Sequence, residues 1–382
     1  ALIEKSKLIS QVKLIELKIN KKQPLKSKVV LNPETSFNNK KIILIDDVLN
    51  SGKTLMHAAA FLLSQDIKKM NTVVLVDRRH RNFPIKADWV GLTLSTTVQE
   101  HINVEISKDE IFSMIENLMN KEDDFALLSE MISLPSEQII HQNVAEIDVE
   151  DVHNKTNNAL LEIGKKFKDV FLKTYEKLNF KKPFDLSTAS VAERALKNTC
   201  LAYLTKLGES DIAYQQFIYS DCMTDQFGAF QSLLSNENSY RDEVIDRFYN
   251  EHRSDVQVMD KWFSAQSISS LSSVDDIKSL MEHELFTMKN PNRVRSVIGS
   301  FSQNTSQFHC QEGYQLLSDV IVELDGLNPQ IAARFASIFN HWRRFTPKYS
   351  ELQEMQIKSI IDRDKISKDV FEIVQSAISG KH

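Results

Sequence analysis

The sequence has no long uninterrupted run of apolar residues, few cysteines and no excess of basic residues. A helix that crosses a membrane needs about 20 consecutive apolar residues, so we predict that this is not a membrane protein. The formal net charge is -5, which excludes a general electrostatic attraction to nucleic acid or to anionic lipid. Binding partners must therefore be inferred from local features of the chain.

Cysteine is scarce, and the three cysteines, Cys200, Cys222 and Cys310, are odd in number and far apart. This spacing argues against a disulfide framework and against a metal site. Free, buried thiols in a reducing compartment are expected. The first seven residues mix charged and apolar side chains and lack the apolar core of a signal peptide. We therefore expect a cytoplasmic protein, and the lack of an initial methionine allows for a chain that begins partway through a longer one.

Two catalytic signatures each lack one residue. Residues 51–54 resemble the end of a nucleotide-binding P-loop, but Asp47 stands where that motif needs its first glycine. His283 and Glu284 begin like a zinc-peptidase motif, but Thr287 stands where the second histidine belongs. We therefore expect neither a P-loop nucleotide site nor a zinc site of this type.

The length of 382 residues exceeds the usual size of one hydrophobic core and predicts two domains. Before about residue 106, the apolar residues form short β-type runs. These runs are residues 12–17, 29–31, 42–45 and 73–76. The last two are continuous, as in parallel strands covered on both faces, and residues 55–69 can form the crossover helix between them. The crossover predicts an α/β domain with a parallel sheet over residues 1–106.

From Asp109 onward, segments of helical length carry apolar residues at three- and four-residue spacing. One such stripe consists of Val191, Ala195, Cys200, Tyr203, Leu204 and Leu207. Residues 272–276 contain a capping box that predicts the start of a helix. We expect no strand after Ile106. Helices of this size without an exact repeat predict an all-α superhelical stack, like ARM or HEAT repeats, over residues 107–382.

The most informative segment is an apolar strand that ends in Asp46 and Asp47 and is followed by a small polar loop and a helix. Free backbone N–H groups, the positive end of the helix and the hydroxyls of Ser51 and Thr54 would favour a phosphate. The two carboxylates can accept hydrogen bonds from ribose hydroxyls, because open α/β sheets bind ligands at the carboxyl ends of their strands. The alternative is that two acids merely end a strand and a Ser-Gly pair makes the turn.

Residues 42–55 resemble the phosphoribosyl-pyrophosphate (PRPP) motif of type I phosphoribosyltransferases, and residues 76–91 are similar to the matching stretch of pyrimidine-operon regulators with uracil phosphoribosyltransferase activity. The resemblance implies that the domain binds PRPP or another phosphorylated ribose, that Asp46 and Asp47 hold the ribose hydroxyls and that Mg²⁺ bridges the pyrophosphate. It assigns the 5′-phosphate to Asn50, Ser51, Gly52, Lys53 and Thr54. The implied reaction, displacement at the anomeric carbon, depends on positioning and charge neutralisation.

A basic cluster follows the second apolar run and consists of Arg78, Arg79, His80 and Arg81. Arginine binds phosphate well, so this cluster is a candidate for contact with RNA or with a nucleotide. A solvated basic loop is the favoured alternative, because the chain has no overall basic excess. Trp89 is a candidate for stacking on a nucleobase, but we expect it to pack in the core.

Four segments of the second region look like consecutive landmarks of the C-terminal domain of M1-family alanyl aminopeptidases of the aminopeptidase N type. They are residues 220–225, 258–263, 286–296 and 327–334. This resemblance runs from about Asp109 to the end. It implies a superhelical stack that closes over a zinc-bearing catalytic domain, forms a chamber that limits peptide entry, and carries no metal. A peptide or an aminopeptidase catalytic domain is the implied partner.

Arg293 and Arg295 project from one helical turn on different faces. One interpretation is that an arginine points into the chamber and binds a peptide carbonyl or carboxylate. The favoured alternative is a salt bridge between stacked helices. The acids considered for that bridge are Glu282, Glu284 and Asp325.

Residues 12–20 resemble the hood segment of these transferases, which covers the active site. In the transferases a strand, loop and helix that bind pyrophosphate precede this segment, but here only residues 1–11 precede it. The site is therefore expected to be open on one side. Three hypotheses follow. The first is that the chain is a non-catalytic helical partner domain preceded by a phosphoribosyltransferase remnant. The second is that it is a pyrimidine phosphoribosyltransferase or regulator completed by another chain, and the third is that it is a fusion or truncation product whose pieces act in their full-length parents. We favour the first and third together.

Overall fold

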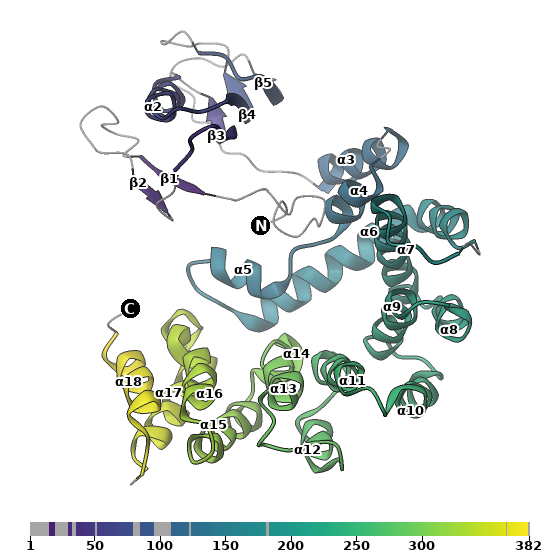
Figure 1. Cartoon of the computed structure of the whole chain (residues 1–382), viewed down its shortest axis with the longest axis vertical. Helices are drawn as coiled ribbons and strands as arrows, with labels where there is room; N and C mark the ends of the chain where they lie inside the picture. The colour runs from purple at the N-terminus through teal and green to yellow at the C-terminus, as the bar shows by residue number, and fades with distance from the viewer. Residues whose placement is uncertain are drawn as a thin grey trace. The chain divides into compact units, whose positions relative to one another are not determined.

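The chain divides into two compact units, residues 1–107 and 108–382. A computed structural model of the chain describes residues 15–19, 30–32, 36–49, 52–78, 85–94, 108–121, 124–180, 183–363 and 365–380. Strands lie in the first unit and a long succession of helices makes up the second (Figure 1). The change from short apolar runs to helical periodicity in the sequence corresponds to this change in architecture.

The first unit contains a parallel sheet with the strand order β3-β4-β5 and a separate antiparallel pair, β1-β2. The strands are β1 (Glu16–Lys18), β2 (Val30–Asn32), β3 (Lys41–Leu49), β4 (Lys69–Arg78) and β5 (Trp89–Leu94). The parallel sheet is confirmed. Strand β5 was missed, because its short apolar run includes Gly91 and follows a polar stretch.

Helix α2 (Lys53–Leu63) connects β3 to β4 and packs on one face of the sheet. The crossover helix is confirmed, but Leu63, which was expected on its buried side, is 64% exposed. The prediction that β3 is covered on both faces is also wrong. Ile43 and Ile45 are 59% and 56% exposed, because no described helix lies against the face of β3 to which they belong.

The second unit consists of helices that follow one another along a curved stack (Figure 1). Its first half contains α3 (Lys108–Lys121), α4 (Phe125–Ile132), α5 (Glu137–Asn143), α6 (Val149–Leu178), α7 (Thr188–Lys206), α8 (Ser210–Tyr219), α9 (Met223–Leu234) and α10 (Arg241–His252). Its second half contains α11 (Val256–Ile268), α12 (Val274–Glu282), α13 (Pro291–Val294), η3 (Arg295–Gly299), α14 (Thr305–Phe308), α15 (Gln311–Asp325), α16 (Pro329–Ala336), η4 (Ser337–Arg344), α17 (Pro347–Ile361) and α18 (Lys368–Ser379). The predicted helical stack is confirmed.

Local sequence signals account for several helix starts. The predicted capping box is present at α12, where the Ser273 side chain accepts from the backbone N–H of Asp276 and the Asp276 carboxylate accepts from that of Ser273. In α7 the buried face differs from the predicted stripe by one position, because Ala195 is exposed. Ala192 and Leu196 are buried in its place, together with Cys200. All three cysteines are free thiols, but the expectation that they are buried is wrong for Cys222 and Cys310, which are only partly buried.

Two segments about 200 residues apart in sequence are bound to each other within the helical unit. The backbone N–H of Ile147 donates to Arg344 O (2.6 Å), and the N–H of Thr346 donates to Ile147 O (3.0 Å). The Arg344 guanidinium also donates to the backbone carbonyls of His141 (2.7 Å) and Val144. The start of α6 is therefore attached to the last helices of the stack.

Aromatic rings pack beside this connection. The rings of His141 and His309 lie 6.2 Å apart, and both lie close to Phe345. His309 Nδ1 is 2.8 Å from the hydroxyl of Tyr314. Burial and, to a smaller extent, the nearby His141 lower the pKa of His309 from 6.5 to about 3. Burial also lowers the pKa of His141, so both rings are neutral at pH 7.

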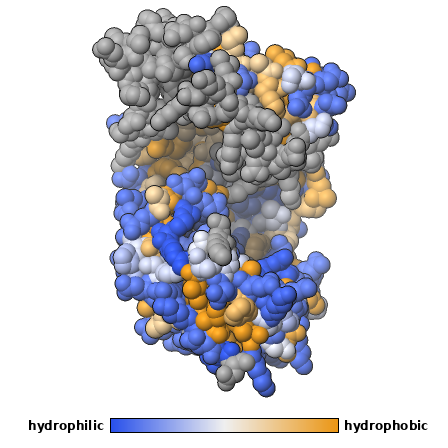
Figure 2. Space-filling view, turned by 90° about the vertical axis from the view of Figure 1, so that its left-hand side faces the viewer, coloured by the Kyte–Doolittle hydropathy of each residue, from blue (hydrophilic) through white to orange (hydrophobic). Residues whose placement is uncertain are grey.

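On the face shown in Figure 2, the described surface is largely hydrophilic, with hydrophobic residues in limited patches such as the strip in the lower part of the view. Among the residues placed by the structure, no helix has both the length and the apolar character needed to span a membrane.

We expect stability of the helical unit to decrease in acid because of His309. Its pKa is about 3 in the folded chain and near 6.5 when exposed, so the unfolded chain binds more protons between these values. The stabilisation is complete above pH 6.5 and is lost as the pH falls toward 3. In that range His309 should contribute a slope of about 1.4 kcal/mol per pH unit to the free energy of unfolding.

The measurement is urea unfolding of the full chain, followed by far-UV circular dichroism between pH 7 and pH 4.5. His309→Phe removes the proton uptake and should flatten the pH dependence, although it costs the contact with Tyr314 at every pH. His341→Asn changes an exposed histidine and serves as the control. An unchanged slope in His309→Phe would contradict the prediction.

Candidate functional site

The predicted phosphate loop lies between β3 and α2. Asp46 and Asp47 lie near the end of β3, and Lys53 and Thr54 begin α2. Gly52 precedes the helix with a φ of 83°, a left-handed conformation that favours glycine. Asn50 and Ser51 lie outside the described residues. Two acids and the amino end of a helix therefore occur at the same end of the strand, as sugar-phosphate binding requires.

Asp77 is an additional acid at this edge of the sheet that the sequence reasoning did not select. The parallel register pairs Leu49 of β3 with Asp77 of β4, so the carboxyl ends of both strands carry acids. Asp77 is only 4% exposed. The signal was available in the sequence, because Asp77 directly follows the predicted apolar run 73–76.

The basic and aromatic candidates of the first unit are only partly described. Arg78 is the last residue of β4, whereas Arg79, His80 and Arg81 lie outside the described residues. Trp89 begins β5 and is 54% exposed, so the prediction that it packs in the core is wrong. Its position at the start of the last strand in the order β3-β4-β5 leaves its ring less covered than that of a central-strand residue.

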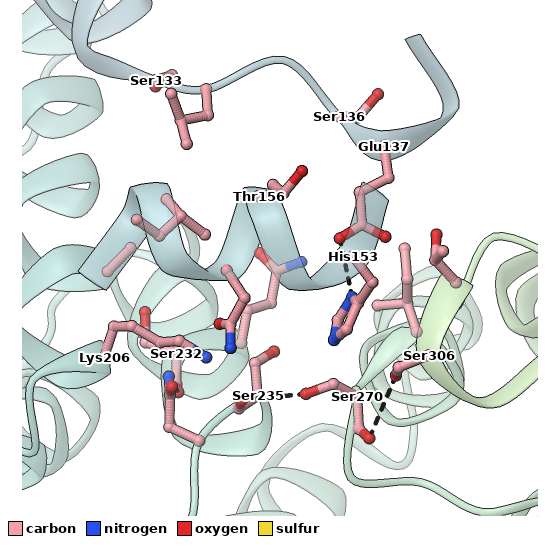
Figure 3. Close-up of a pocket in the computed structure, with 18 of the residues that line it drawn as sticks. Ser133, Ser136, Glu137, His153, Thr156, Lys206, Ser232, Ser235, Ser270 and Ser306 are labelled. Atoms are coloured by element: carbon pink, nitrogen blue, oxygen red, sulfur yellow. Dashed lines mark hydrogen bonds and ion pairs between the residues drawn. The ribbon is translucent and has the colours of Figure 1, made fainter. Parts of the chain in front are cut away.

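The helical unit contains a cavity of about 690 Å³ between α6 and the helices α7 and α9. The α4–α5 loop, the start of α5, the segment at the end of α11 and the segment around the start of α14 complete its lining. Hydroxyl groups line it from Ser133, Ser136, Thr156, Ser232, Ser235, Ser270 and Ser306 (Figure 3). Side-chain amides line it from Asn157, Asn198, Gln231, Asn236, Gln303 and Asn304. Sequence reasoning missed this cavity, because its residues come from segments far apart in the chain.

A buried ion pair supports one wall of the cavity. The Lys197 ammonium lies 2.6 Å from the Asp225 carboxylate, and both side chains are 9% exposed. The other carboxylate oxygen of Asp225 accepts from Asn198 Nδ2 (3.0 Å), and Asn198 Oδ1 accepts from Gln216 Nε2 (2.7 Å). Because a buried charge needs a full set of partners, this network fixes the Asn198 amide on the cavity wall.

A second polar group lies on another side of the cavity. Glu137 of α5 and His153 of α6 are 2.9 Å apart, and Figure 3 shows them facing each other across the two helices. Beside them, Gln138 Nε2 donates to Gln303 O (2.6 Å), which joins the α5 side of the lining to the segment before α14. The cavity wall is therefore tied together across more than one hundred residues of sequence.

Arg293 is buried between helices and does not line this cavity. Its guanidinium lies 3.0 Å from the Asp260 carboxylate and 4.8 Å from the centre of the Phe263 ring. The favoured alternative, a salt bridge between stacked helices, is the arrangement observed, but the acid is Asp260 of α11 and none of the three considered from the sequence. Arg295 is exposed and donates to Asn292 Oδ1 (3.2 Å).

The residues that begin like a zinc motif have other roles. His283 follows the last residue of α12, and its Nδ1 accepts from the backbone N–H of Leu285 (3.1 Å). Its ring lies among Tyr249, Trp262 and Phe263, and burial lowers its pKa. Within the described part of the chain, no cluster of three or more His, Cys, Asp or Glu side chains could hold a metal.

Two family models match the chain. A model described as a domain of unknown function (DUF3458_C) with ARM repeats matches residues 90–379. A phosphoribosyl transferase domain model matches residues 6–109. The two matches overlap at residues 90–109, which include all of β5 except Trp89 and the boundary between the two units.

Curated relatives divide in the same way. The chain is 29% identical to aminopeptidase N of Haemophilus influenzae over 72% of its own length and 32% of that protein. It is 27% identical to aminopeptidase N of Escherichia coli over 69% of the chain and 31% of the relative. A 73-residue stretch is 43% identical to the bifunctional protein PyrR of Caldicellulosiruptor bescii and covers 40% of that protein. The chain thus spans about a third of the aminopeptidases that it matches.

A solved structure is also similar. The chain superimposes on Legionella pneumophila aminopeptidase A, crystallised with aspartic acid, with a TM-score of 0.65 and 25% identity. The match covers 73% of this chain and 34% of that one. Both resemblances drawn from the sequence are therefore confirmed.

We expect Gly228→Ala to disturb the cavity wall. A Cβ at Gly228 would lie 2.8 Å from Cγ and Oδ1 of Asn198, which is held by Asp225 and Gln216 and has little freedom to move. Without a clash, alanine should stabilise the helix by about 1 kcal/mol relative to glycine. Because of the clash, we expect the free energy of unfolding to fall by about 1–2 kcal/mol instead.

Urea unfolding measures this loss. Gly326→Ala is the matched control, because its Cβ would meet only one backbone oxygen at 3.6 Å. Equal stability of the two variants would show that Asn198 moves freely and is not fixed by the buried ion pair.

Proposed function

Because the chain belongs to the DUF3458_C family of ARM-repeat domains, we propose that its helical unit is the chamber-forming C-terminal domain of an aminopeptidase N-type enzyme. In this role the unit catalyses nothing itself. It encloses a space next to a zinc-bearing catalytic domain and limits which peptides reach it. The observation that carries the proposal is the polar cavity between α6, α7 and α9.

The cavity fits a peptide backbone in size and chemistry. Its volume of about 690 Å³ lies within the range of ligand pockets, about 300–1,000 Å³. The lining is rich in neutral hydroxyl and amide groups, which can both donate to peptide carbonyls and accept from peptide N–H groups. Such a lining suits many peptides because it pairs with the main chain, and it suits an entry chamber better than a pocket for one side chain.

The partner in this proposal is an aminopeptidase catalytic domain, which supplies the metal and the general base. The known relatives that bear the name aminopeptidase N are about three times longer than the matched region. We also place the protein in the cytoplasm, and the three free cysteines support a reducing compartment.

A peptide-binding experiment tests the chamber proposal. We expect the full chain to bind tetra-alanine weakly, detected by saturation-transfer NMR. Thr156→Trp should abolish the signal by filling the cavity, because the Thr156 side chain lines it. Ser279→Trp on the exposed side of α12 is the control. Equal binding by both variants would show that the peptide lies elsewhere.

For the first unit we propose binding of PRPP with Mg²⁺. The motif at β3 and α2, with Asp46, Asp47 and the left-handed Gly52, supports the proposal. The acid at Asp77, on the neighbouring strand end, adds a further group that can orient a metal or a hydroxyl. The alternative role is a pyrimidine phosphoribosyltransferase or regulator completed by another chain.

Calorimetric titration with PRPP and Mg²⁺ distinguishes these roles. We expect the full chain to bind PRPP. The double variant Asp46→Asn/Asp47→Asn should bind it at least tenfold more weakly, a loss on the order of one charge-assisted hydrogen bond. The control Asp66→Asn changes an exposed acid and should leave the affinity unchanged. PRPP-dependent formation of uridine monophosphate from uracil would favour the alternative. Equal affinity of the two variants would remove Asp46 and Asp47 from the site.

A further inference from the structure

Lys206 is a cation without an acidic partner on the wall of the cavity. It is the last residue of α7 and is half-buried. No carboxylate among the described residues forms an ion pair with its ammonium, and none contributes to its electrostatics. Burial lowers its pKa, as expected for an ammonium that has lost part of its hydration without gaining a counter-charge. A charge in this condition favours an anionic ligand.

The other ionisable groups of the lining do not compensate Lys206. Glu137 is paired with His153, and in Figure 3 this pair lies on the opposite side of the view from Lys206. The side chain of Lys206 extends into the cavity toward Ser232 (Figure 3). Asp225, although near the wall, is already matched by Lys197 and Asn198. The cavity therefore has a positive end with neutral hydrogen-bonding groups around it.

We propose that Lys206 binds the C-terminal carboxylate of a peptide in the cavity. This inference rests on the proposed chamber function and adds a direction to it. With the carboxylate at Lys206, the peptide chain runs across the amide and hydroxyl groups of α6 and α9, such as Asn157 and Gln231. Every linear peptide carries this carboxylate, so the anchor selects for a free chain end and is independent of sequence.

Other carboxylates and phosphates share the same chemistry, and peptide derivatives separate them. Tri-alanine carries a free C-terminus, its C-terminal amide lacks one, and N-acetyl-Ala-Asp-Ala-amide carries only a side-chain carboxylate. Inorganic phosphate tests a general anion site. If the terminal carboxylate is recognised, only tri-alanine gains affinity from Lys206.

The experiment measures affinity of the full chain for these four probes by NMR titration. In Lys206→Met, which keeps the aliphatic stem, tri-alanine should bind about tenfold more weakly, the loss of one charge-assisted hydrogen bond. Its amide should bind with unchanged affinity. Lys206→Arg should retain most of the preference for the free acid. Lys173→Met, at an exposed lysine of α6 outside the lining, is the control.

The outcomes separate this inference from the proposed function. Wild-type chain that binds neither tri-alanine nor its amide would overturn both. Binding of both with equal affinity, unaffected by Lys206→Met, would leave the chamber in place and overturn the anchor. A Lys206-dependent gain for the aspartyl peptide, or displacement of tri-alanine by equimolar phosphate, would show a general anion site and overturn recognition of the chain end.

Discussion

The geometry of the helical unit depends on the connection between residues 141–147 and 344–346. A stack of helices in which each contacts mainly its neighbours is open-ended, and small changes at each interface accumulate along it. Here the backbone of Ile147 is hydrogen-bonded on both sides of Phe345, and Arg344 satisfies carbonyls at the end of α5. The first and last parts of the stack are thereby held in one register, and α5, which contributes Glu137 and Gln138 to the cavity lining, is held in place.

The cavity wall uses polar interactions where the rest of the unit uses apolar packing. Asn198 could rotate into the cavity or away from it, but the ion pair of Lys197 with Asp225 makes one orientation favourable. Removing either charge would leave the other buried and unpaired, which costs far more than the pair itself contributes. The pair therefore specifies the wall more than it stabilises the fold, and it leaves Lys206 as the unmatched charge.

The sequence predicted features that depend on local patterns. The parallel strands, the crossover helix, the capping box at Ser273 and the helical stack follow from periodicity and short motifs, and the structure has all of them. Features that depend on distant residues were not predictable. Asp260 as partner of Arg293, the exposure of Trp89, and the cavity all depend on which elements become neighbours in space. Patterns in a single sequence do not show which elements pack against each other.

The two units also differ in the size of their described hydrophobic cores. In the described part of the α/β unit, the central core cluster contains Leu49, Leu55, Val74 and Ala87, while Ile43 and Ile45 remain largely exposed. In the described part of the helical unit, a large core cluster extends from Ile115 in α3 to Ala377 in α18, and a small separate one contains Ile147, Val149 and Tyr349. Since stabilisation scales with buried apolar area, most of it resides in the helical unit. The cavity and Lys206 thus lie on the unit with the larger described core, whereas the phosphate loop lies on a sheet in which Ile43 and Ile45 of β3 are largely exposed.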